Sequence, residues 1–343
     1  MPAAVCEQLR ERVSHAGVLA RDRPLVAMYS GGRDSSCLLD VAYALLGSAR
    51  VCALHVNYGL RPQAGEDEEH CRALCERLGI ELRVVRARED EGAAPSAPAP
   101  PADPEDGEGA GESDGEAAAG NLQAWARELR YREAERLAGQ RDALIGTGHT
   151  ASDQVETIVY RLAASPGRRA LLGMPASEGR LVRPLLAFTR EQTAAYCRER
   201  GIAWREDESN RDRRFARTRV REGVLPALRE VHPAAEANLL RTAALLREET
   251  ELLDGLVAAE LAGGPRIEIA RLQELPAALA RMVVVELAEG AAGRFVPQAG
   301  ERVQEILALA RRGPRGELHV GASVGAVIHD GVLEMVKLPP RRG

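Results

Sequence analysis

The sequence predicts an α/β protein in which a doubly wound, mainly parallel sheet is followed by a mainly helical domain with a small β element at its end. Over residues 24–163, short apolar segments alternate with longer amphipathic ones, which is typical of a parallel sheet with helices on both faces. Helical periodicity then dominates residues 216–311, and two short strand-like segments follow. We therefore expect two domains, 1–215 and 216–343.

Four apolar segments are predicted as the strands of the first domain: residues 24–29, 51–57, 81–87 and 143–148. Each precedes a predicted helix, and these helices are residues 37–46, 66–79, 121–140 and 152–163. Gly79 fits the end of the second helix, because glycine readily adopts the left-handed conformation found there. Since ligands bind at the carboxyl ends of parallel strands, the segments after the first and fourth strands should meet in one crevice.

The second domain is expected to consist mainly of amphipathic helices. An apolar face recurs at helical spacing in its last helix: Val303, Ile306, Leu307 and Ala310. Residues 317–321 and 331–338 are predicted as strands, with a turn at Asp330-Gly331. This β element carries no motif that indicates a chemical role.

Composition is that of a soluble globular protein. The chain has 343 residues, of which 45% are hydrophobic and 28% charged. No apolar run approaches the roughly 18 residues that a membrane span needs, and the first residues lack the apolar core of a signal peptide. The six cysteines are scattered and form no CxxC pair, which fits a reducing compartment. We therefore expect a cytoplasmic protein that makes no membrane contact.

Residues 89–120 form an acidic segment, which holds ten of the 51 acidic residues and none of the 46 basic ones. It contains no aliphatic side chain larger than alanine, so burial cannot offset the entropy lost on ordering it. We predict a disordered insertion in a loop, without a catalytic role. The alternative is a mimic of nucleic acid that shields a basic cleft.

The segment SGGRDS at residues 30–35 directly follows the first predicted strand and opens the next helix. Its two glycines let a ligand approach the backbone, and the N–H groups at a helix start favour an anion. Asp34 would repel a phosphate, so it indicates either a Mg²⁺ ligand or a helix cap. The pattern matches neither GxxxxGK[ST] nor GxGxxG, which excludes a Walker-type loop and a dinucleotide-binding loop.

This strand–loop–helix segment resembles the pyrophosphate-loop (PP-loop) motif of the ATP pyrophosphatases, whose fold is adenine-nucleotide alpha-hydrolase-like. These enzymes cleave ATP between the α and β phosphates and adenylate a substrate. The resemblance implies that ATP and a metal bind this loop, with Asp34 near the metal and ATP on Ser30, Gly31, Gly32, Arg33, Asp34 and Ser35. The alternative is a plain turn capped by serine and aspartate.

Four further segments resemble those of the tRNA(Ile)-lysidine synthetases, in the same order and at similar spacing. They are HVNYGLRP (55–62), NLQAWARELRY (121–131), GHTASDQVET (148–157) and EDESNRDRRFARTRVREGVLP (206–226). The combination is much more specific than the loop alone. The resemblance implies a ligase in tRNA processing that adenylates the wobble cytidine of a CAU-anticodon tRNA(Ile) at its C2 oxygen. The amine of L-lysine then attacks C2, expels AMP and forms lysidine, which changes the codon read from AUG to AUA.

Carboxylates after the first and fourth strands should face each other across the crevice. Asp34 and Asp153 can share a Mg²⁺ ion that bridges ATP phosphates. Glu156 is either a ligand for the lysine ammonium or an ordinary acidic residue at a helix start. His149 is a candidate proton acceptor or hydrogen-bond donor, although a lone histidine more often has a structural role. The candidate catalytic residues are Asp34, Asp153 and His149.

Arginines in two segments are candidates for contacts with tRNA, because arginine clusters suit phosphate backbones. Helical spacing places several of them on shared faces. The alternative is a solvated surface that pairs with the acidic segment, but an activating site nearby favours tRNA. The candidate residues are Arg127, Arg130, Arg214, Arg217, Arg219 and Arg221.

Three other functions stay open at this point. A tRNA thiolation enzyme of the same superfamily would be expected to use cysteine pairs, and the lack of a CxxC pair argues against it. A ligase that amidates a small molecule would need no RNA. A catalytically silent tRNA-binding protein is the third, because Ser152 stands where the family usually has an aspartate. The sequence leaves the oligomeric state open, and a homodimer is one option.

Overall fold

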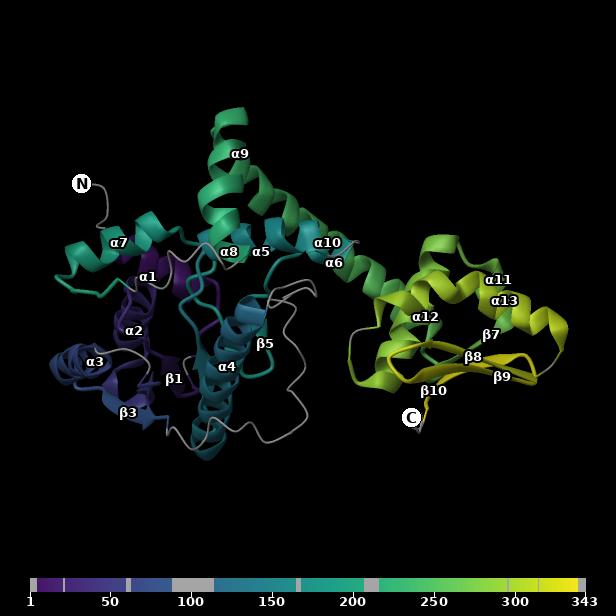
Figure 1. Ribbon diagram of the computed structural model, residues 1–343, viewed down its shortest axis with the longest axis horizontal. Coiled ribbons are helices and arrows are strands. Elements are labelled where there is room, and N and C mark those ends of the chain that lie inside the picture. Colours follow the sequence, from purple (N-terminus) through teal and green to yellow (C-terminus); the bar gives the residue numbers. More distant parts are fainter. Residues whose placement is uncertain are drawn as a thin grey trace. The chain divides into compact units, whose positions relative to one another are not determined.

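The computed structural model describes residues 5–20, 22–59, 63–87, 114–164, 168–206, 216–294, 296–313 and 315–338. The chain forms two compact units, Met1–Ala244 and Leu245–Gly343, each with its own apolar core. Figure 1 shows the elements of both units in the order of the chain. Within the described residues, no helix combines the length and apolar character that crossing a membrane requires.

A six-stranded sheet forms the centre of the first unit, with the strand order β3-β2-β1-β4-β6-β5. Every neighbouring pair is parallel except β5 with β6. The strands are β1 (Leu25–Met28), β2 (Val51–Asn57), β3 (Glu81–Arg86), β4 (Leu144–Gly146), β5 (Ser177–Glu178) and β6 (Leu181–Val182). The predicted α/β class and its four strands are confirmed. The pair β5 and β6 was not predicted, because two-residue strands carry no periodicity.

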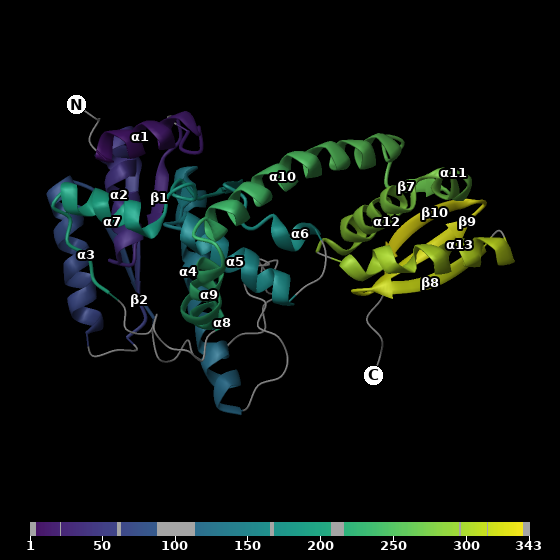
Figure 2. The ribbon, with the colours of Figure 1, turned by 90° about the horizontal axis from the view of Figure 1, so that it is seen from above.

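Helices cover both faces of this sheet, because successive side chains of β1 point to opposite sides. Leu25 and Ala27 pack in one apolar cluster with residues of helices α1, α2, α3 and α7. Val26 and Met28 pack into another cluster with α4. Figure 2 shows the two layers on either side of β1 and β2. The helices are α1 (Val5–His15), α2 (Arg33–Leu46), α3 (Ala64–Leu78), α4 (Asp114–Arg141) and α7 (Arg190–Glu199).

Helix α4 begins earlier than the sequence indicates. Residues 114–120 are helical, so the prediction of disorder is wrong for this part of the acidic segment. The run of three alanines at 117–119 explains the difference, because alanine is the best helix former and an existing helix extends at little cost. The rest of the segment, 89–113, lies outside the described residues.

The first unit continues beyond residue 215, where we expected its boundary. Val220 and Leu225 are buried against Val155, which attaches the following helices to the first unit. The elements concerned are α5 (Ala151–Ala164), α6 (Arg168–Leu171), α8 (Ala216–Arg219), the π-helix η4 (Val220–Val224), α9 (Leu225–Val231) and the start of α10 (Ala235–Glu260). A short 3₁₀ turn, η1 (Ser48–Arg50), precedes β2.

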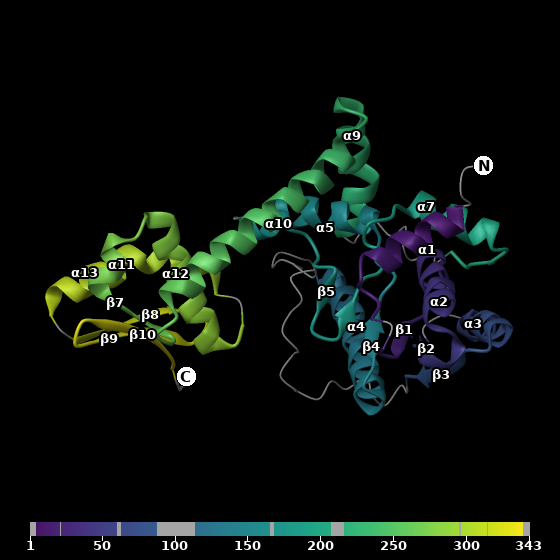
Figure 3. The ribbon, with the colours of Figure 1, turned by 180° about the vertical axis from the view of Figure 1, so that it is seen from behind.

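The second unit is a four-stranded antiparallel sheet with helices packed on it, in the order β7-β10-β9-β8. Figure 3 shows α12 and α13 beside these strands. Two strands were expected and four are present: β7 is too short for a periodic signal, and β9 follows β8 after a two-residue turn. The elements are β7 (Arg266–Glu268), α11 (Ile269–Glu274), α12 (Ala277–Ala292), η5 (Pro297–Arg302), α13 (Val303–Arg312), β8 (Arg315–Gly321), β9 (Val324–His329) and β10 (Val332–Lys337).

The turn between β9 and β10 confirms the prediction at Asp330-Gly331. Both residues have positive φ values, 51° and 78°. This is the backbone that a two-residue hairpin needs to match the right-handed twist of its strands. Aspartate and glycine are among the few residue types that adopt it readily.

Candidate functional site

The loop between β1 and α2 requires glycine at its second position. Gly31 has a φ of 81°, and a Cβ atom there would lie 3.1 Å from Sγ of Cys71 on α3. The carbonyl of Gly31 accepts a hydrogen bond of 3.0 Å from the backbone N–H of Arg205. The positive φ strains any other residue at this position, and the packing leaves little room for a side chain.

The serines of the loop fix its shape. The hydroxyl of Ser35 donates to the carbonyl of Gly32 at 2.9 Å and accepts from the backbone N–H of Ser30 at 3.3 Å. Ser35 is buried, whereas Ser30 is exposed. Gly32 is the N-cap of α2 and supplies no side-chain cap to the helix. The N–H groups of the first turn are thus available to an anion from outside the helix.

The segment after β4 contacts the start of α2. A Cβ atom on Gly148 would lie 2.9 Å from the carbonyl carbon of Asp34 and 2.9 Å from the nitrogen of Ser35. The backbones of the two segments therefore touch, with no room for a side chain between them. β1 and β4 are neighbours in the sheet, and the two following segments meet at its carboxyl edge, as the sequence predicted.

Asp34 lies in the first turn of α2 and is held by two residues. Arg33 donates to both of its oxygens, at 2.9 and 3.1 Å. The hydroxyl of Thr193 on α7 donates to Oδ1 at 2.5 Å. The carboxylate is 22% exposed, so it is open to a ligand from the crevice.

Asp153 lies in the first turn of α5 and is held by a different set of donors. Its Oδ2 accepts from the backbone N–H of Thr150 at 2.8 Å and from the Thr150 hydroxyl at 2.7 Å. Its Oδ1 pairs with the guanidinium of Arg190. Burial alone would raise the pKa of Asp153, but Arg190, His149 and Thr150 outweigh it and lower the pKa to about 2. The group is therefore ionised at any physiological pH.

Glu156 is almost fully buried and paired with two arginines. Arg190 donates to Oε1 at 2.6 Å, and Arg221 donates to Oε1 and Oε2 at 2.7 and 2.9 Å. Both carboxylate oxygens are thus occupied in a side chain that is 3% exposed. A lysine ammonium would reach Glu156 only if an arginine moved away.

Arg190, at the start of α7, links the carboxylates of the crevice. Desolvation alone would lower its pKa, but the fields of Asp153, Glu156 and Asp34 raise the pKa above its usual value. The guanidinium therefore stays protonated among three carboxylates. We did not predict it from the sequence, and it follows none of the four predicted strands.

His149 lies beside the carboxylates and is half-buried. Its Nδ1 is 2.8 Å from the hydroxyl of Thr147, which orients the imidazole. Its positive charge, when protonated, would help to lower the pKa of Asp153, so the two side chains are electrostatically coupled. The structure thus brings His149, Asp153 and Asp34 to one place, as predicted.

The candidate tRNA-contacting arginines do not form one set. The guanidinium of Arg127 lies 4.7 Å from the ring centre of Tyr131, and that of Arg130 lies 5.9 Å from it. Arg217 and Arg219 lie on α8, and Arg219 is exposed. Arg221 instead faces Glu156, inside the site. Arg214 lies outside the described residues.

The donor set of the crevice suits Mg²⁺ held jointly with a nucleotide. Across the described part of the chain, three or more His, Cys, Asp or Glu side chains nowhere gather as a metal site would require. Asp34 and Asp153 offer carboxylate oxygens from two strand ends. Mg²⁺ commonly binds through one or two carboxylates and completes its shell with phosphates and water. The two residues fit this mode.

Two residues of the site, Arg190 and Thr193, were missed, and the close approach of Gly148, within the GHTASDQVET segment, was not predicted. Gly148 has a signal in hindsight, since a glycine directly after a strand end often marks a close backbone approach. Arg190 and Thr193 have none, because they follow β6, whose two residues cannot be recognised as a strand. Only the sheet order places them beside β4.

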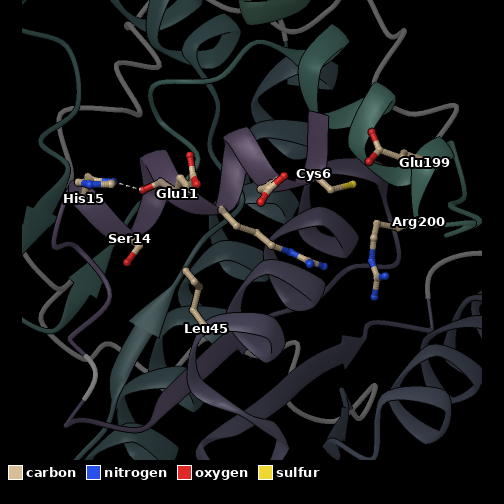
Figure 4. A pocket seen from close by; sticks show the side chains of 9 residues that line it. Cys6, Glu11, Ser14, His15, Leu45, Glu199 and Arg200 are labelled. Carbon is tan, nitrogen blue, oxygen red and sulfur yellow. Dashed lines mark hydrogen bonds between the residues drawn. The ribbon is translucent and has the colours of Figure 1, made fainter. Parts of the chain in front are cut away.

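A surface pocket of about 640 Å³ lies apart from this crevice, on α1 and the end of α7. Cys6, Glu199 and Arg200 line it, together with the first helix (Figure 4), and none of the candidate site residues does. Arg200 and Arg10 also bind the buried carboxylate of Asp40, at 3.0 and 2.9 Å. The network joins α1, α2 and α7, so its role is to hold these helices together.

The fold and the crevice define a class of protein. A glycine-containing loop after the first strand of a parallel sheet, facing carboxylates after the neighbouring strand, is the arrangement of a PP-loop protein. Residues 5–228 match the model of the PP-loop domain family, and the chain belongs to that family.

More particular relatives agree with the motifs. The chain is 34% identical over 265 residues to a tRNA(Ile)-lysidine synthase of Pseudomonas fluorescens, covering 72% of this chain and 54% of that protein. It is 37% identical over 280 residues to the tRNA(Ile)-lysidine synthase of Thermus thermophilus, covering 79% and 50%. The chain thus spans about half the length of these relatives. The resemblance identified from the motifs is confirmed.

The fold also occurs in a solved structure of low sequence identity. A U34-tRNA thiolase of Methanococcus maripaludis, with its [4Fe-4S] cluster, superposes with a TM-score of 0.52 at 15% identity. The match covers 71% of this chain and 79% of that chain. At this identity the likeness concerns the fold alone.

Proposed function

We propose that this protein is a tRNA(Ile)-lysidine synthase, a ligase that joins L-lysine to C2 of the wobble cytidine of CAU-anticodon tRNA(Ile) through an adenylated cytidine. The observation that carries the proposal is the meeting of the SGGRDS and GHTASDQVET segments in one crevice, through the contact of Gly148 with Asp34 and Ser35. The relatives that this chain matches over 265 and 280 residues are named for the same activity.

ATP binding is assigned to the loop of residues 30–35. The uncapped start of α2 offers N–H groups to the phosphates, and Arg33 adds a positive charge. Ser35 acts indirectly, since its hydroxyl bonds are made within the loop. Asp34 and Asp153 would hold Mg²⁺, which when bound offsets the charge that builds up on the departing pyrophosphate.

Proton removal from the lysine amine is assigned to His149. A neutral amine is the nucleophile, so a nearby group must accept its proton. With its pKa of about 2, Asp153 is a weak proton acceptor, and it serves better as a fixed negative charge. His149, oriented by Thr147, is the better acceptor of the two. The lysine ammonium would need another anchor while Arg190 and Arg221 hold Glu156.

The tRNA is assigned to four exposed or half-buried arginines and to the second unit. The wobble base must leave its stack before C2 can be reached, so the anticodon has to be held in an open conformation. We propose backbone contacts for Arg127, Arg130, Arg217 and Arg219, to which Arg214 would add. Arg221 is left out of this group, because it faces Glu156.

The direct test incubates the protein with ATP, Mg²⁺, labelled lysine and a tRNA(Ile) transcript with a CAU anticodon, beside a tRNA(Met) control. Both tRNAs have the same anticodon, so the pair separates recognition of the tRNA body from recognition of the wobble base. We expect label on the tRNA(Ile) alone. Pyrophosphate release that depends on tRNA but transfers no lysine would keep the adenylation and overturn the choice of nucleophile. No pyrophosphate release from folded protein would overturn the proposal.

A further inference from the structure

The charges of the crevice are balanced by the protein's own side chains. Three carboxylates, Asp34, Asp153 and Glu156, pair with three guanidiniums, Arg33, Arg190 and Arg221. A divalent cation that binds Asp153 must therefore compete with a positive charge that is already in place. Which arginine gives way depends on the bonds that each of them makes.

The two oxygens of Asp153 are held to different degrees. Oδ2 accepts two hydrogen bonds from Thr150, the residue just before α5, so this contact is fixed by the start of the helix. Oδ1 is bound by the side chain of Arg190. Oδ1 is thus the oxygen that a movement of Arg190 would expose.

Arg190 can leave its second partner without stranding a buried charge. Arg221 binds both oxygens of Glu156, at 2.7 and 2.9 Å, and would keep this carboxylate paired. Removing the last partner of a buried ion is strongly unfavourable, but that situation does not arise here. Arg221, in contrast, contacts both oxygens of Glu156, whereas Arg190 contacts only Oε1 among the bonds of the described residues.

Arg190 also lies within the field of the ATP-binding loop. Asp34 in the first turn of α2 attracts its guanidinium, and Thr193, one turn along α7, bonds to the same carboxylate. The side chain is 20% exposed, so a ligand in the crevice can reach it. A guanidinium binds two phosphate oxygens at once in a planar geometry.

We propose that Arg190 is an exchangeable cation of this site, which binds Oδ1 of Asp153 and turns to the phosphates of ATP when the nucleotide binds. The movement opens Oδ1 to the divalent cation, so nucleotide and metal bind in a coupled way. The inference rests on the proposed function, because it takes ATP as the ligand. Arg190 is on this view a binding and positioning residue that the motifs do not contain.

Arg190→Gln separates the two halves of this role. Mn²⁺ alone, followed by electron paramagnetic resonance, should bind the variant about tenfold more tightly, because its competitor is gone. Binding of α,β-methylene-ATP in EDTA, followed by calorimetry, should weaken about tenfold, because a phosphate ligand is gone. Arg190→Lys keeps a charge and should lose less of the nucleotide affinity. A melting temperature like that of the wild type shows that the variants are folded.

The matched control is Arg180→Gln, which removes an arginine bound to Asp142 at the amino end of β4, the opposite edge of the sheet. Both affinities should stay at the wild-type values in this variant. If Arg190→Gln weakens both affinities or changes neither, Arg190 has a merely structural role and the inference is overturned. If the wild-type protein binds the ATP analogue, such a result leaves the proposed function in place. If the wild type binds the analogue neither in EDTA nor in the presence of Mg²⁺, both are overturned.

Discussion

Asp34 and Asp153, at neighbouring strand ends, differ in how firmly their carboxylates are held. Asp34 is held by the side chains of Arg33 and Thr193, without a fixed helix-start contact. Asp153 is anchored by the backbone and hydroxyl of Thr150. A ligand can therefore reorganise the contacts of Asp34 more easily. Asp153 supplies a charge in a constant position.

Asp34→Asn is expected to lower ATP-dependent pyrophosphate release by a factor of about 100 or more, because it removes a metal-binding charge and keeps the shape. The fold should be unaffected, since the side chain is partly exposed. A coupled pyrophosphate assay and thermal unfolding measure the two effects. Asp142→Asn, at the amino end of β4, is the control. Activity close to that of wild type would rule out the metal role of Asp34.

Asp153 should make the first unit sensitive to acid. Its pKa falls from 3.8 to about 2 on folding, which contributes about 2 kcal/mol of stability at pH 5 and above. This contribution declines as the pH falls through 3.8 towards 2, because the unfolded chain then binds a proton that the folded chain does not. About half of it is lost between pH 5 and 3.

Urea unfolding, followed by the fluorescence of Trp125 and Trp204, measures this effect, since both tryptophans lie in the first unit. The stability difference between wild type and Asp153→Asn should shrink by about 1 kcal/mol from pH 5 to pH 3. The remaining carboxylates titrate in both proteins and cancel. A difference that is constant over this pH range would contradict the lowered pKa of Asp153.

Among the elements, α7 has the largest share in shaping the site. Its first residue binds Asp153 and Glu156, and Thr193 in its first turn binds Asp34. Its other end binds Asp40, a fully buried carboxylate of α2, through the hydroxyl of Tyr196 at 2.6 Å. Helix α7 therefore holds α2 at its first turn and at its middle. The loop of residues 30–35, which opens α2, takes its position from these contacts.

Gly148→Ala should disturb the contact between the β4–α5 segment and α2. The added Cβ would lie 2.9 Å from two backbone atoms, so one of the segments must move. We expect a loss of about 1–3 kcal/mol in stability and at least a tenfold loss of affinity for α,β-methylene-ATP. Gly139→Ala is the control, because nothing lies within 4 Å of a Cβ atom there and alanine favours its helix. Wild-type affinity in Gly148→Ala would show that the close approach does not position the site.

On the scale of the whole molecule, two cores divide the protein. The first unit holds every described residue that we assign to ATP, metal and proton transfer. The second unit has its own cluster of buried side chains around its antiparallel sheet. Under the proposed function, the chemistry belongs to the first unit and RNA binding is shared with the second.

Removal of residues 245–343 should separate these tasks. The shortened chain should keep the fluorescence of its two tryptophans and bind α,β-methylene-ATP within about threefold of the full chain, since its core is intact. Its affinity for tRNA(Ile) should fall and depend less on salt concentration, because fewer phosphates are contacted. Gel-shift titrations at several salt concentrations measure this. Unchanged tRNA binding would exclude the second unit from RNA recognition.

Local sequence patterns were enough to predict the alternating strands and helices, the glycine-containing loop at residues 30–35 and the family. These properties are local: apolar periodicity, glycines at a strand end and short motifs can be read within a few neighbouring residues. The placement of Asp34 and Asp153 in one crevice also followed, since adjacent parallel strands end at the same edge. The partners of these carboxylates did not follow.

The positions of Arg190 and Thr193 in the site, and the contact of Arg221 with Glu156, became visible only in the folded chain. Arg190 lies 34 positions after Glu156 in the sequence, and Arg221 lies 65 positions after it. Thr193 lies 159 positions after Asp34. The two-residue strand β6, paired with β4, brings α7 to the crevice. Such a contact depends on sheet order and packing between distant segments. No periodicity or motif in the chain encodes it locally.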